Sequence, residues 1–382
     1  MSGALGGPAV RTTTITASCQ APWATPPASD ASPTALSVAV LTGRDALRHL
    51  GADWVALQST VHPLNPFLSW EWQWSWWEEF GEARTPSWLT FRDGDRLVGV
   101  LPLCAEPGAA TVLRIGGGLD LSDHLGFLAE DACASRVAAA TVEWLRAGAA
   151  PGTVLDLRFL PEGSASLTEL QAAAVAAGLA VADRAEEVSP VVAVPGDFEA
   201  YLETCLGKKD RHELRRKRRR LDQEHPGWRL VGHGELGLER ALDRFFALHR
   251  ASHPDKAAFL TEANIRFFRR VAARLDDSGW LRLQLLVTGG EPVAATLGFT
   301  VDGTWYLYNS GYDPAAARWS VGLLCVAEGV RAAIAEGCTR CDFLRGNEPY
   351  KYDLGAHDRA LHALQVGSAA RRPAGGPGGV GR

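Results

Sequence analysis

The sequence predicts an α/β protein with a mixed, mostly antiparallel sheet flanked by helices, assembled from two copies of one unit. Three observations support this prediction. Apolar runs joined by Asp-Gly or Gly-Gly pairs indicate β-hairpins at residues 87–104 and 280–312. Segments with apolar residues at helical spacing lie between these runs. The same order of hairpin, alanine-rich helix and acid-ended strand occurs in both halves, which indicates an internal repeat.

The length and composition fit two domains. The 382 residues are 46% hydrophobic and 22% charged, which allows a large core and two domains of ordinary size. We expect the first domain at residues 36–195 and the second at residues 196–368. The flanking stretches 1–35 and 369–382 are rich in small residues and proline and predict disordered tails.

In the first half, a strand from Leu36 and a helical pattern over residues 44–58 precede a tryptophan-rich helix at residues 69–81. Ser69 is a suitable N-cap for that helix and Gly81 a suitable stop. It carries five of the thirteen tryptophans, and Trp70, Trp74 and Trp77 share one face. These rings can form an aromatic wall for a substrate, or they can fix the helix to the sheet. Aromatic burial in protein cores favours the second interpretation.

A loop with a glycine triplet follows the first hairpin. The triplet, residues 116–118, lacks the spacing of a phosphate-binding loop. Asp123 and His124 come next, and we keep them as candidate pocket residues, with capping or solvation as the alternative. A helix at about residues 132–147, the strand 154–160 and a second helix complete the first half.

The second half begins with a basic run, Lys208–Arg220, which holds nine lysines and arginines against two acids. Such a run is commonly a solvated helix face. Alternatively, it binds phosphates of coenzyme A, a lipid-linked sugar or tRNA. Helices over residues 235–253 and 261–279, a three-stranded meander and a helix over residues 318–337 follow.

The helix leads into the most polar stretch of the chain, residues 341–355. A short apolar strand here becomes a turn rich in titratable groups, at a place where α/β folds commonly hold their sites. The candidate catalytic residues are Asp342, Glu348, Tyr350 and Lys351, and Arg345 and Asn347 are candidate substrate ligands. The alternatives are a turn cap for Asp342, packing for Tyr350, and structural ion pairs of Arg345 and Lys351 with Glu348.

Several classes of protein and site are not supported. No window of ~18 apolar residues and no continuous signal-peptide core are present, so we expect a cytoplasmic protein without a membrane span. The seven cysteines include one Cys-x-x-Cys pair, Cys338 and Cys341, without a second pair or histidines at ligand spacing. We therefore expect no metal site. The sequence leaves the oligomeric state open.

The quoted motifs carry a family resemblance. The motifs that carry this resemblance are ELRRKRRRLDQEHPGW, PVAATLGF, YLYNSGYDP, SVGLL and CDFLRGNEPYKYDLG. Residues 202–356 resemble the CelD-type acyltransferases associated with cellulose biosynthesis, in the GNAT superfamily. The first half is similar in outline only. The relatives include Fem-type peptidoglycan enzymes, which also pair two such domains. The resemblance implies a twisted sheet in which two neighbouring strands part and admit the pantetheine arm of an acyl-CoA.

The implied activity is transfer of an acyl group, with acetyl from acetyl-CoA as the first expectation, to an amine of a small molecule or a cell-envelope sugar. The residues expected at the donor are Asn309, Gly311, Tyr312, Arg318, Ser320 and Gly322, and Trp70, Asp123 and His124 are expected at the acceptor. The usual loop, Gln/Arg-x-x-Gly-x-Gly/Ala, is replaced here by RWSVGLL. An aminoacyl-tRNA-dependent Fem-like transferase and a non-catalytic binding module therefore stay as alternatives.

Overall fold

The computed structural model describes residues 11–14, 35–81, 86–106, 108–118 and 120–367. Within these residues, fourteen strands form one continuous sheet. The first-half strands are β1 (Arg11–Thr14), β2 (Ser37–Thr42), β3 (Pro86–Asp93), β4 (Arg96–Glu106), β5 (Ala109–Ile115), β6 (Leu128–Ala129), β7 (Val154–Pro161) and β8 (Ala180–Ala193). The second-half strands are β9 (Arg229–Gly232), β10 (Leu281–Thr288), β11 (Glu291–Val301), β12 (Thr304–Tyr312), β13 (Arg340–Asp342) and β14 (His357–Gly367).

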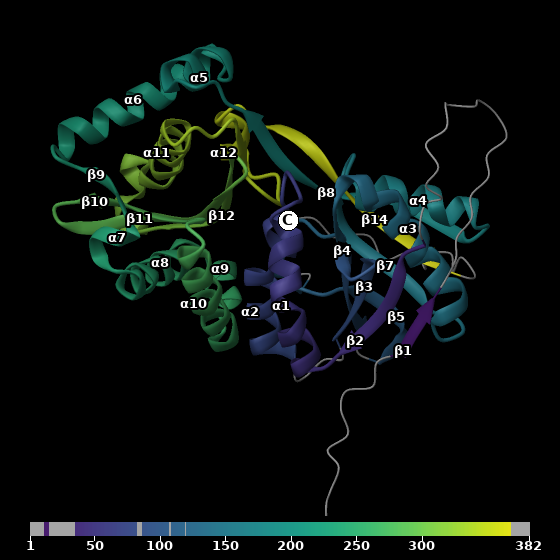
Figure 1. Cartoon of the computed structure of the whole chain (residues 1–382). Coiled ribbons are helices and arrows are strands. Elements are labelled where there is room, and N and C mark those ends of the chain that lie inside the picture. Colours follow the sequence, from purple (N-terminus) through teal and green to yellow (C-terminus); the bar gives the residue numbers. More distant parts are fainter. Residues whose placement is uncertain (1–10, 15–34, 82–85, 107, 119, 368–382) are drawn as a thin grey trace, which may run out of the picture.

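The strand order shows that the two halves repeat one unit and exchange their last strands. The order is β1-β2-β3-β4-β5-β7-β14-β8-β13-β12-β11-β10-β9, and β6 pairs separately with β4. Strand β14 lies beside β7 of the first half, and β8 lies beside β13 of the second half. Strands β8 and β14 then pair with each other, antiparallel, from His357↔Val191 to Gly367↔Ala180 (Figure 1). The predicted mixed sheet of two similar units is confirmed.

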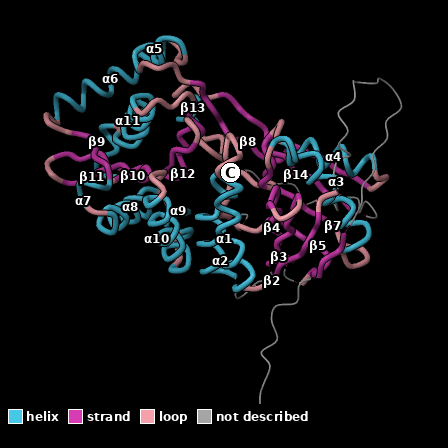
Figure 2. Tube along the Cα trace, in the orientation of Figure 1, coloured by secondary structure: helices cyan, strands magenta, loops and turns pink. Residues whose placement is uncertain are grey.

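Helices cover both faces of the sheet in each half (Figure 2). In the first half these are α1 (Arg44–Gln58), α2 (Trp70–Phe80), α3 (Ala134–Glu143) and α4 (Ala165–Ala176). In the second half they are α5 (Phe198–Thr204), α6 (Lys208–Glu224), α7 (His233–Leu236), α8 (Leu238–Ser252), α9 (Pro254–Phe259), α10 (Glu262–Asp277), α11 (Val321–Ala335) and α12 (Pro349–Asp353). One core cluster spans the first half and the α8–α10 side of the second, and another lies under α5, α6 and α11.

The helix caps form as the sequence predicts. The Ser69 hydroxyl accepts a hydrogen bond from the Trp72 amide at the start of α2, and the Thr261 hydroxyl accepts one from the Asn264 amide at the start of α10. Each bond satisfies an amide that has no partner within its helix. Residues 349–353, expected in a turn, form the short helix α12 instead, because Pro349 fits the first position of a helix.

Strands β8 and β14 are absent from the sequence prediction. Strand β8 joins the halves, and most of residues 182–187 are exposed, so its pattern lacks the alternation that marks a half-buried strand. The predicted boundary at residues 195 and 196 falls between β8 and α5, yet each half receives its last strand from the other. The division into two domains stays a prediction.

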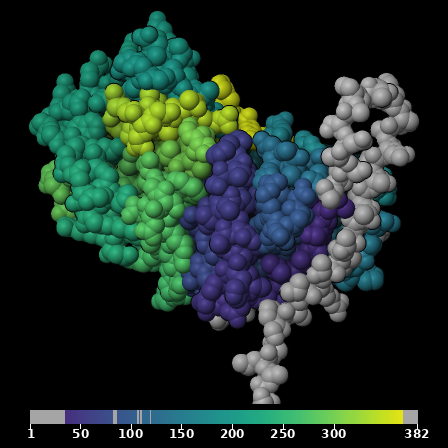
Figure 3. Space-filling view, viewed as in Figure 1, coloured from purple at the N-terminus to yellow at the C-terminus, as the bar shows by residue number. Residues whose placement is uncertain are grey.

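A helix pair makes a second junction between the halves. Helix α2 packs against α10, where Phe267 meets the Trp72 ring edge-on at 5.2 Å between centroids. Arg274 donates to Glu78 at 2.7 Å in the same interface. Figure 3 shows this contact as purple atoms of the first half lying directly against green atoms of the second.

Two predictions concern the ends of the chain and the membrane. Of the tail predicted at residues 1–35, Arg11–Thr14 form β1 against β2, and residues 1–10 and 15–34 lie outside the described residues. The predicted tail at residues 369–382 also lies outside them. No helix in the described part of the chain has the length and apolar character needed to cross a membrane.

The strand exchange predicts cooperative unfolding of the two halves. Leu364 on β14 is fully buried between elements of the first half, so Leu364→Ala should lower the free energy of unfolding by ~2–5 kcal/mol. Both halves should still unfold in one urea transition, seen by tryptophan fluorescence and by circular dichroism. Val175→Ala, at a 63% exposed position, is the control and should change stability by less than ~0.5 kcal/mol. Two separate transitions in the Leu364→Ala variant would contradict the coupling.

Candidate active site

Two neighbouring strands of the second half pair only briefly. Strands β12 and β13 are parallel and pair at only three positions, the last of which is Tyr306↔Asp342. Strand β12 continues to Tyr312, and its register with β11 shifts so that Tyr308 is an extra residue. Such a bulge bends the strand. Strand β13 ends at Asp342, so β12 runs on beyond Tyr306 without pairing to it.

A cavity of about 640 Å³ lies near the end of β12, and we call it the donor pocket. It is bounded by the end of β12, the start of α11, helix α9 and helix α12. Its lining residues are Ser252, His253, Asp255, Lys256, Ser310, Tyr312, Ala317, Ser320, Val321, Gly322, Leu323, Val326, Glu348 and Tyr350. Its size is in the range of sites for small molecules and cofactors.

The first turn of α11 faces the donor pocket. Ser320 precedes the helix in a left-handed conformation, with φ of 56°, and its side chain does not cap the helix. A Cβ on Gly322 would lie 3.0 Å from the Tyr312 ring, so glycine permits this close packing. No acidic residue occupies the first turn. The amide groups and the helix dipole therefore favour an anion in the pocket.

A partly buried cation, Lys256, lies at the β12 side of the donor pocket. Lys256 Nζ donates to the Ser310 carbonyl at 2.6 Å, and His249 Nδ1 lies 3.0 Å from the same oxygen. Burial, together with the nearby Lys256 charge, lowers the pKa of His249 to about 4. His249 is therefore neutral near pH 7 and carries its proton on Nδ1. Burial also lowers the pKa of Lys256, while the Glu348 carboxylate acts in the opposite direction.

The turn after β13 is held by two charged side chains. Asp342 Oδ1 accepts the Leu344 amide at 2.9 Å, which supports the left-handed Leu344 with its φ of 56°. Lys351 Nζ donates to the carbonyls of residues 344, 345 and 346 at 2.9–3.0 Å. Lys351 also pairs with Glu348 at 2.9 Å and is 3% exposed. Its ammonium group is thus fully engaged in the turn, which is a positioning contact.

The four candidate catalytic residues are distributed over different surroundings. Glu348 and Tyr350 line the donor pocket. Burial raises the pKa of Tyr350, so its phenol stays protonated. Asp342 instead faces a second cavity of about 300 Å³ between the two halves, which we call the seam pocket. Lys351 lines neither.

Of the six expected donor residues, Tyr312, Ser320 and Gly322 line the donor pocket. Gly311 faces helix α8 instead, because a Cβ there would lie 2.3 Å from the His249 amide nitrogen. Arg318 is exposed and stacks on its neighbour Trp319 at 4.1 Å. Asn309 is partly buried on β12 and does not line the pocket.

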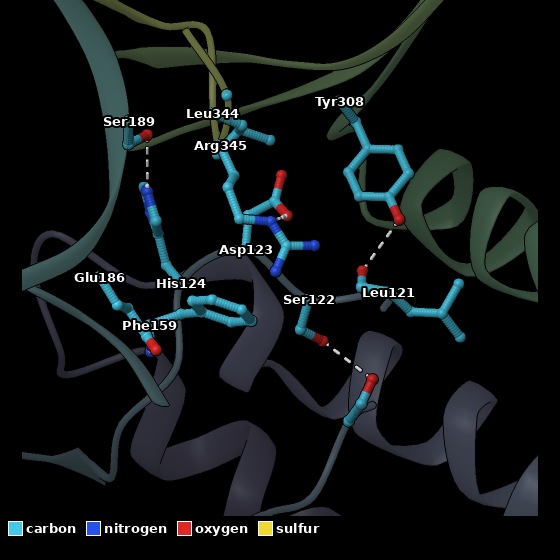
Figure 4. Close-up of polar contacts among 12 residues, drawn as sticks. Leu121, Ser122, Asp123, His124, Phe159, Glu186, Ser189, Tyr308, Leu344 and Arg345 are labelled. Carbon is cyan, nitrogen blue, oxygen red and sulfur yellow. Dashed lines mark hydrogen bonds and ion pairs between the residues drawn. The ribbon is translucent and has the colours of Figure 1, made fainter. Parts of the chain in front are cut away.

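The structure brings first-half and second-half candidates together at the seam (Figure 4). His124 Nε2 lies 3.0 Å from Ser189 Oγ on β8, and Ser189 donates to Asp342 Oδ1 at 2.8 Å. Because Ser189 has one proton, His124 donates to it through Nε2. Burial lowers the pKa of His124. Asp123 pairs with Arg345 at 3.3 Å, and burial raises the pKa of this carboxyl group.

Two other acceptor candidates lie elsewhere. Trp70 stacks on Trp74 at 5.1 Å between centroids and packs against the first-half core, as the structural interpretation of the tryptophan helix predicted. Asn347 is exposed at the tip of the turn and lines neither pocket. In the glycine triplet, a Cβ on Gly117 would lie 2.8 Å from the Gln73 amide, so this glycine allows close packing.

Comparisons with known proteins agree with this geometry. Residues 208–352 match the family profile described as an acetyltransferase (GNAT) domain. The solved structure of FemX superposes with a TM-score of 0.58 at 11% identity, over 82% of this chain and 95% of that one. A tandem GNAT protein from the clavulanic acid biosynthesis pathway gives 0.44 at 13% identity, over 87% and 99%. A search of curated proteins finds no significant match.

The chain has a mixed α/β fold of two similar units. The GNAT profile covers the half that holds the donor pocket, and the similarity of fold to FemX covers both halves. In the first half, helix α3 also lacks an acid in its first turn, and Asp156, the third residue of β7, is bound by Arg114 at 3.1 Å and by Gln365 at 3.2 Å.

The basic run forms helix α6 and is largely paired with acids. Five of its nine basic side chains form ion pairs with glutamates: Arg215, Arg216, Lys217, Arg218 and Arg220. Arg218 pairs with Glu328 of α11, so α6 is also fixed to the GNAT-like core. Within the described residues, no cluster of three or more histidine, cysteine or acidic side chains is suited to hold a metal ion.

Sequence reasoning missed Lys256, Ser189 and the role of His249. Lys256 lies in HPDKAAF, a segment without motif or periodic pattern, so only the three-dimensional contact with Ser310 reveals it. Ser189 lies on the unpredicted strand β8. A lone buried histidine on an apolar helix face, such as His249, has no sequence signal that separates a site residue from a core residue.

The pKa of His249 predicts acid sensitivity of the donor pocket. The folded-state pKa of about 4 is below the ordinary value of 6.5. The contribution of this group to stability is therefore complete above pH 6.5 and is lost as the pH falls toward 4, because the unfolded chain binds the proton more tightly than the folded protein does. The expected loss is roughly 2–4 kcal/mol in the free energy of unfolding between pH 7 and pH 4. His249→Asn should reduce this pH dependence in urea titrations. An unchanged pH dependence in that variant would rule out the assignment.

Proposed function

We propose that this protein is an N-acyltransferase that binds an acyl-CoA in the donor pocket and transfers its acyl group to an amine. The observation that carries the proposal is the combination, at one cavity, of a strand β12 that extends beyond its pairing with β13, an acid-free helix terminus and a partly buried lysine. Phosphate groups fit such a helix terminus, and Lys256 adds a positive charge. The GNAT profile over the same residues supports this assignment.

The chemistry requires a new N–C bond, cleavage of the thioester C–S bond and two proton movements. The attacking amine loses a proton, and the leaving thiolate gains one. Glu348 is bound to Lys351, whereas Asp342 uses only Oδ1 in hydrogen bonds from the described residues. We therefore assign Asp342 as the first choice of base, with Glu348 as the second. Tyr350, whose pKa is raised by burial, is the proton donor to the thiolate.

The second candidate is an aminoacyl-tRNA-dependent transferase of the Fem type. The fold similarity to FemX and the basic helix α6 favour it. The pairing of five α6 cations with glutamates leaves fewer positive charges for a nucleic-acid backbone, so we rank it second. The CelD-type resemblance favours a cell-envelope sugar as acceptor.

Donor binding is the direct test of the first proposal. Acetyl-CoA or a longer acyl-CoA should raise the melting temperature, because a ligand at 100 times its Kd adds ~2.7 kcal/mol to stability. Lys256→Met should weaken acyl-CoA binding about 10-fold by calorimetry, through loss of one charge-assisted contact. Lys209→Met on exposed α6 is the matched control and should bind normally. A shift with aminoacylated tRNA alone, weakening steeply with salt, would favour the Fem-type alternative.

Tyr350 and Tyr352 form a matched pair of tyrosines on α12. Tyr350→Phe should lower kcat by ~10²-fold or more with little change in KM, because a positioned general acid contributes about that much. Tyr352, whose hydroxyl donates to Asp358 on the surface, is the control, and Tyr352→Phe should retain normal kcat. Steady-state kinetics with the acyl-CoA found by binding measures both. Equal kcat values in the two variants would remove Tyr350 from the mechanism.

A further inference from the structure

The seam pocket contains charged groups of both signs from the two halves. The first half contributes residues 61–65 and 124–134 and the start of α4. The second half contributes Tyr306, Arg340, Asp342 and Arg359. Its volume of about 300 Å³ suits a small molecule.

The positive groups of the seam pocket are not neutralised by the protein. Neither Arg340 nor Arg359 forms an ion pair with a carboxylate of the described residues, although both line a pocket that also holds Asp342. Arg359 donates to the Glu162 carbonyl at 3.2 Å. The start of α4 lies in the same wall, and the Ser164 hydroxyl there is buried without a hydrogen-bond partner. Guanidinium groups and a free helix terminus bind carboxylate or phosphate.

Two carboxylates line the pocket: Asp131, which is exposed, and Asp342, which is 2% exposed. Asp342 Oδ1 is used by Ser189 and by the Leu344 amide, and Asp342 Oδ2 lies 3.8 Å from His124. His124 does not neutralise this carboxylate, because burial lowers the pKa of the imidazole. The free oxygen is suited to accept a hydrogen bond from an ammonium group.

The spacing of these charges constrains a ligand. Arg340 and Asp342 are two residues apart on β13 and therefore lie on the same face, with Cα atoms ~6.6 Å apart. Arg340 is exposed and Asp342 is buried. A ligand with only a negative charge would therefore leave the buried Asp342 carboxylate without a cationic partner, which is costly where water is partly excluded. A ligand with both an ammonium and an anionic group satisfies both.

We propose that the acceptor is a small amine that also carries a carboxylate or phosphate, bound in the seam pocket. Its ammonium group lies on Asp342 Oδ2, and its anionic group lies on Arg340 and Arg359. The inference rests on the proposed acyl transfer. Asp342 belongs to the last position at which β13 pairs with β12, at the start of the turn whose Glu348 lines the donor pocket. Asp342 takes one proton from the ammonium group, and the amine nitrogen bonds to the acyl carbon as the thioester C–S bond breaks. The second proton lost by the nitrogen replaces the one that Tyr350 gives to the leaving thiolate.

Ligand binding without any donor tests the charge requirement. The probes are the twenty amino acids, linear ω-amino acids of two to six carbons, and glucosamine 6-phosphate. Each zwitterion that raises the melting temperature is compared with one analogue that lacks the anionic group and one that lacks the ammonium group. For glucosamine 6-phosphate these analogues are glucosamine and glucose 6-phosphate. We expect at least one zwitterion to bind at least 10-fold more tightly than both analogues. Binding of an amino acid would identify the anionic group of the ligand as a carboxylate, and binding of glucosamine 6-phosphate would identify it as a phosphate. No binding by any probe, or equal binding of an analogue, overturns the proposal.

Variants locate the binding. Arg340→Gln and Arg359→Gln should each weaken zwitterion binding about 10-fold, and Arg146→Gln is the control, since Arg146 pairs with Glu143 on the surface. Two arginine variants keep the test valid if one misfolds. Acyl-CoA binding should be unchanged in both, so loss of zwitterion binding is distinguishable from failure of the donor site. Unaltered zwitterion affinity in both folded variants would exclude the seam pocket.

Discussion

The antiparallel pairing of β8 with β14 is the interaction on which the rest of the structure depends. It joins two GNAT-like units into one sheet and places the last strand of each unit beside the other. Ser189 of β8 reaches Asp342 of β13 only because these strands are neighbours. The seam pocket is therefore a product of the exchange, and neither half contains it alone.

The two halves differ in how their strand carboxylates are satisfied. Helices α11 and α3 both lack an acid in the first turn, so this feature does not distinguish the halves. Asp156 on β7 accepts hydrogen bonds from Arg114 through Oδ2 and from Gln365 through Oδ1, whereas Asp342 Oδ2 accepts none from the described residues. Residues of the first half line most of the seam pocket.

Local signals in the sequence predicted most elements, because hairpin turns, helix caps and helical periodicity are encoded by neighbouring residues. The strand exchange was not predictable, since it depends on pairing between segments about 170 residues apart and β8 lacks alternation. The polar stretch at residues 341–355 was correctly singled out as polar and close to a cavity. The sequence did not show that Asp342 and Glu348 of this stretch face different pockets. The direction of the Asp342 side chain depends on β13, and that of the Glu348 side chain depends on the turn that follows.

The turn between β13 and α12 separates the two pockets, and its rigidity explains the unusual burial of Lys351. A left-handed Leu344 costs roughly 1–3 kcal/mol and persists only where its surroundings fix it. The Asp342 carboxylate fixes the Leu344 amide, and the Lys351 ammonium fixes three successive carbonyls. Both contacts make Asp342 and Glu348 parts of one rigid turn, one facing each pocket. In the proposed transfer, such a turn would hold the amine-binding and donor-binding groups at a constant separation.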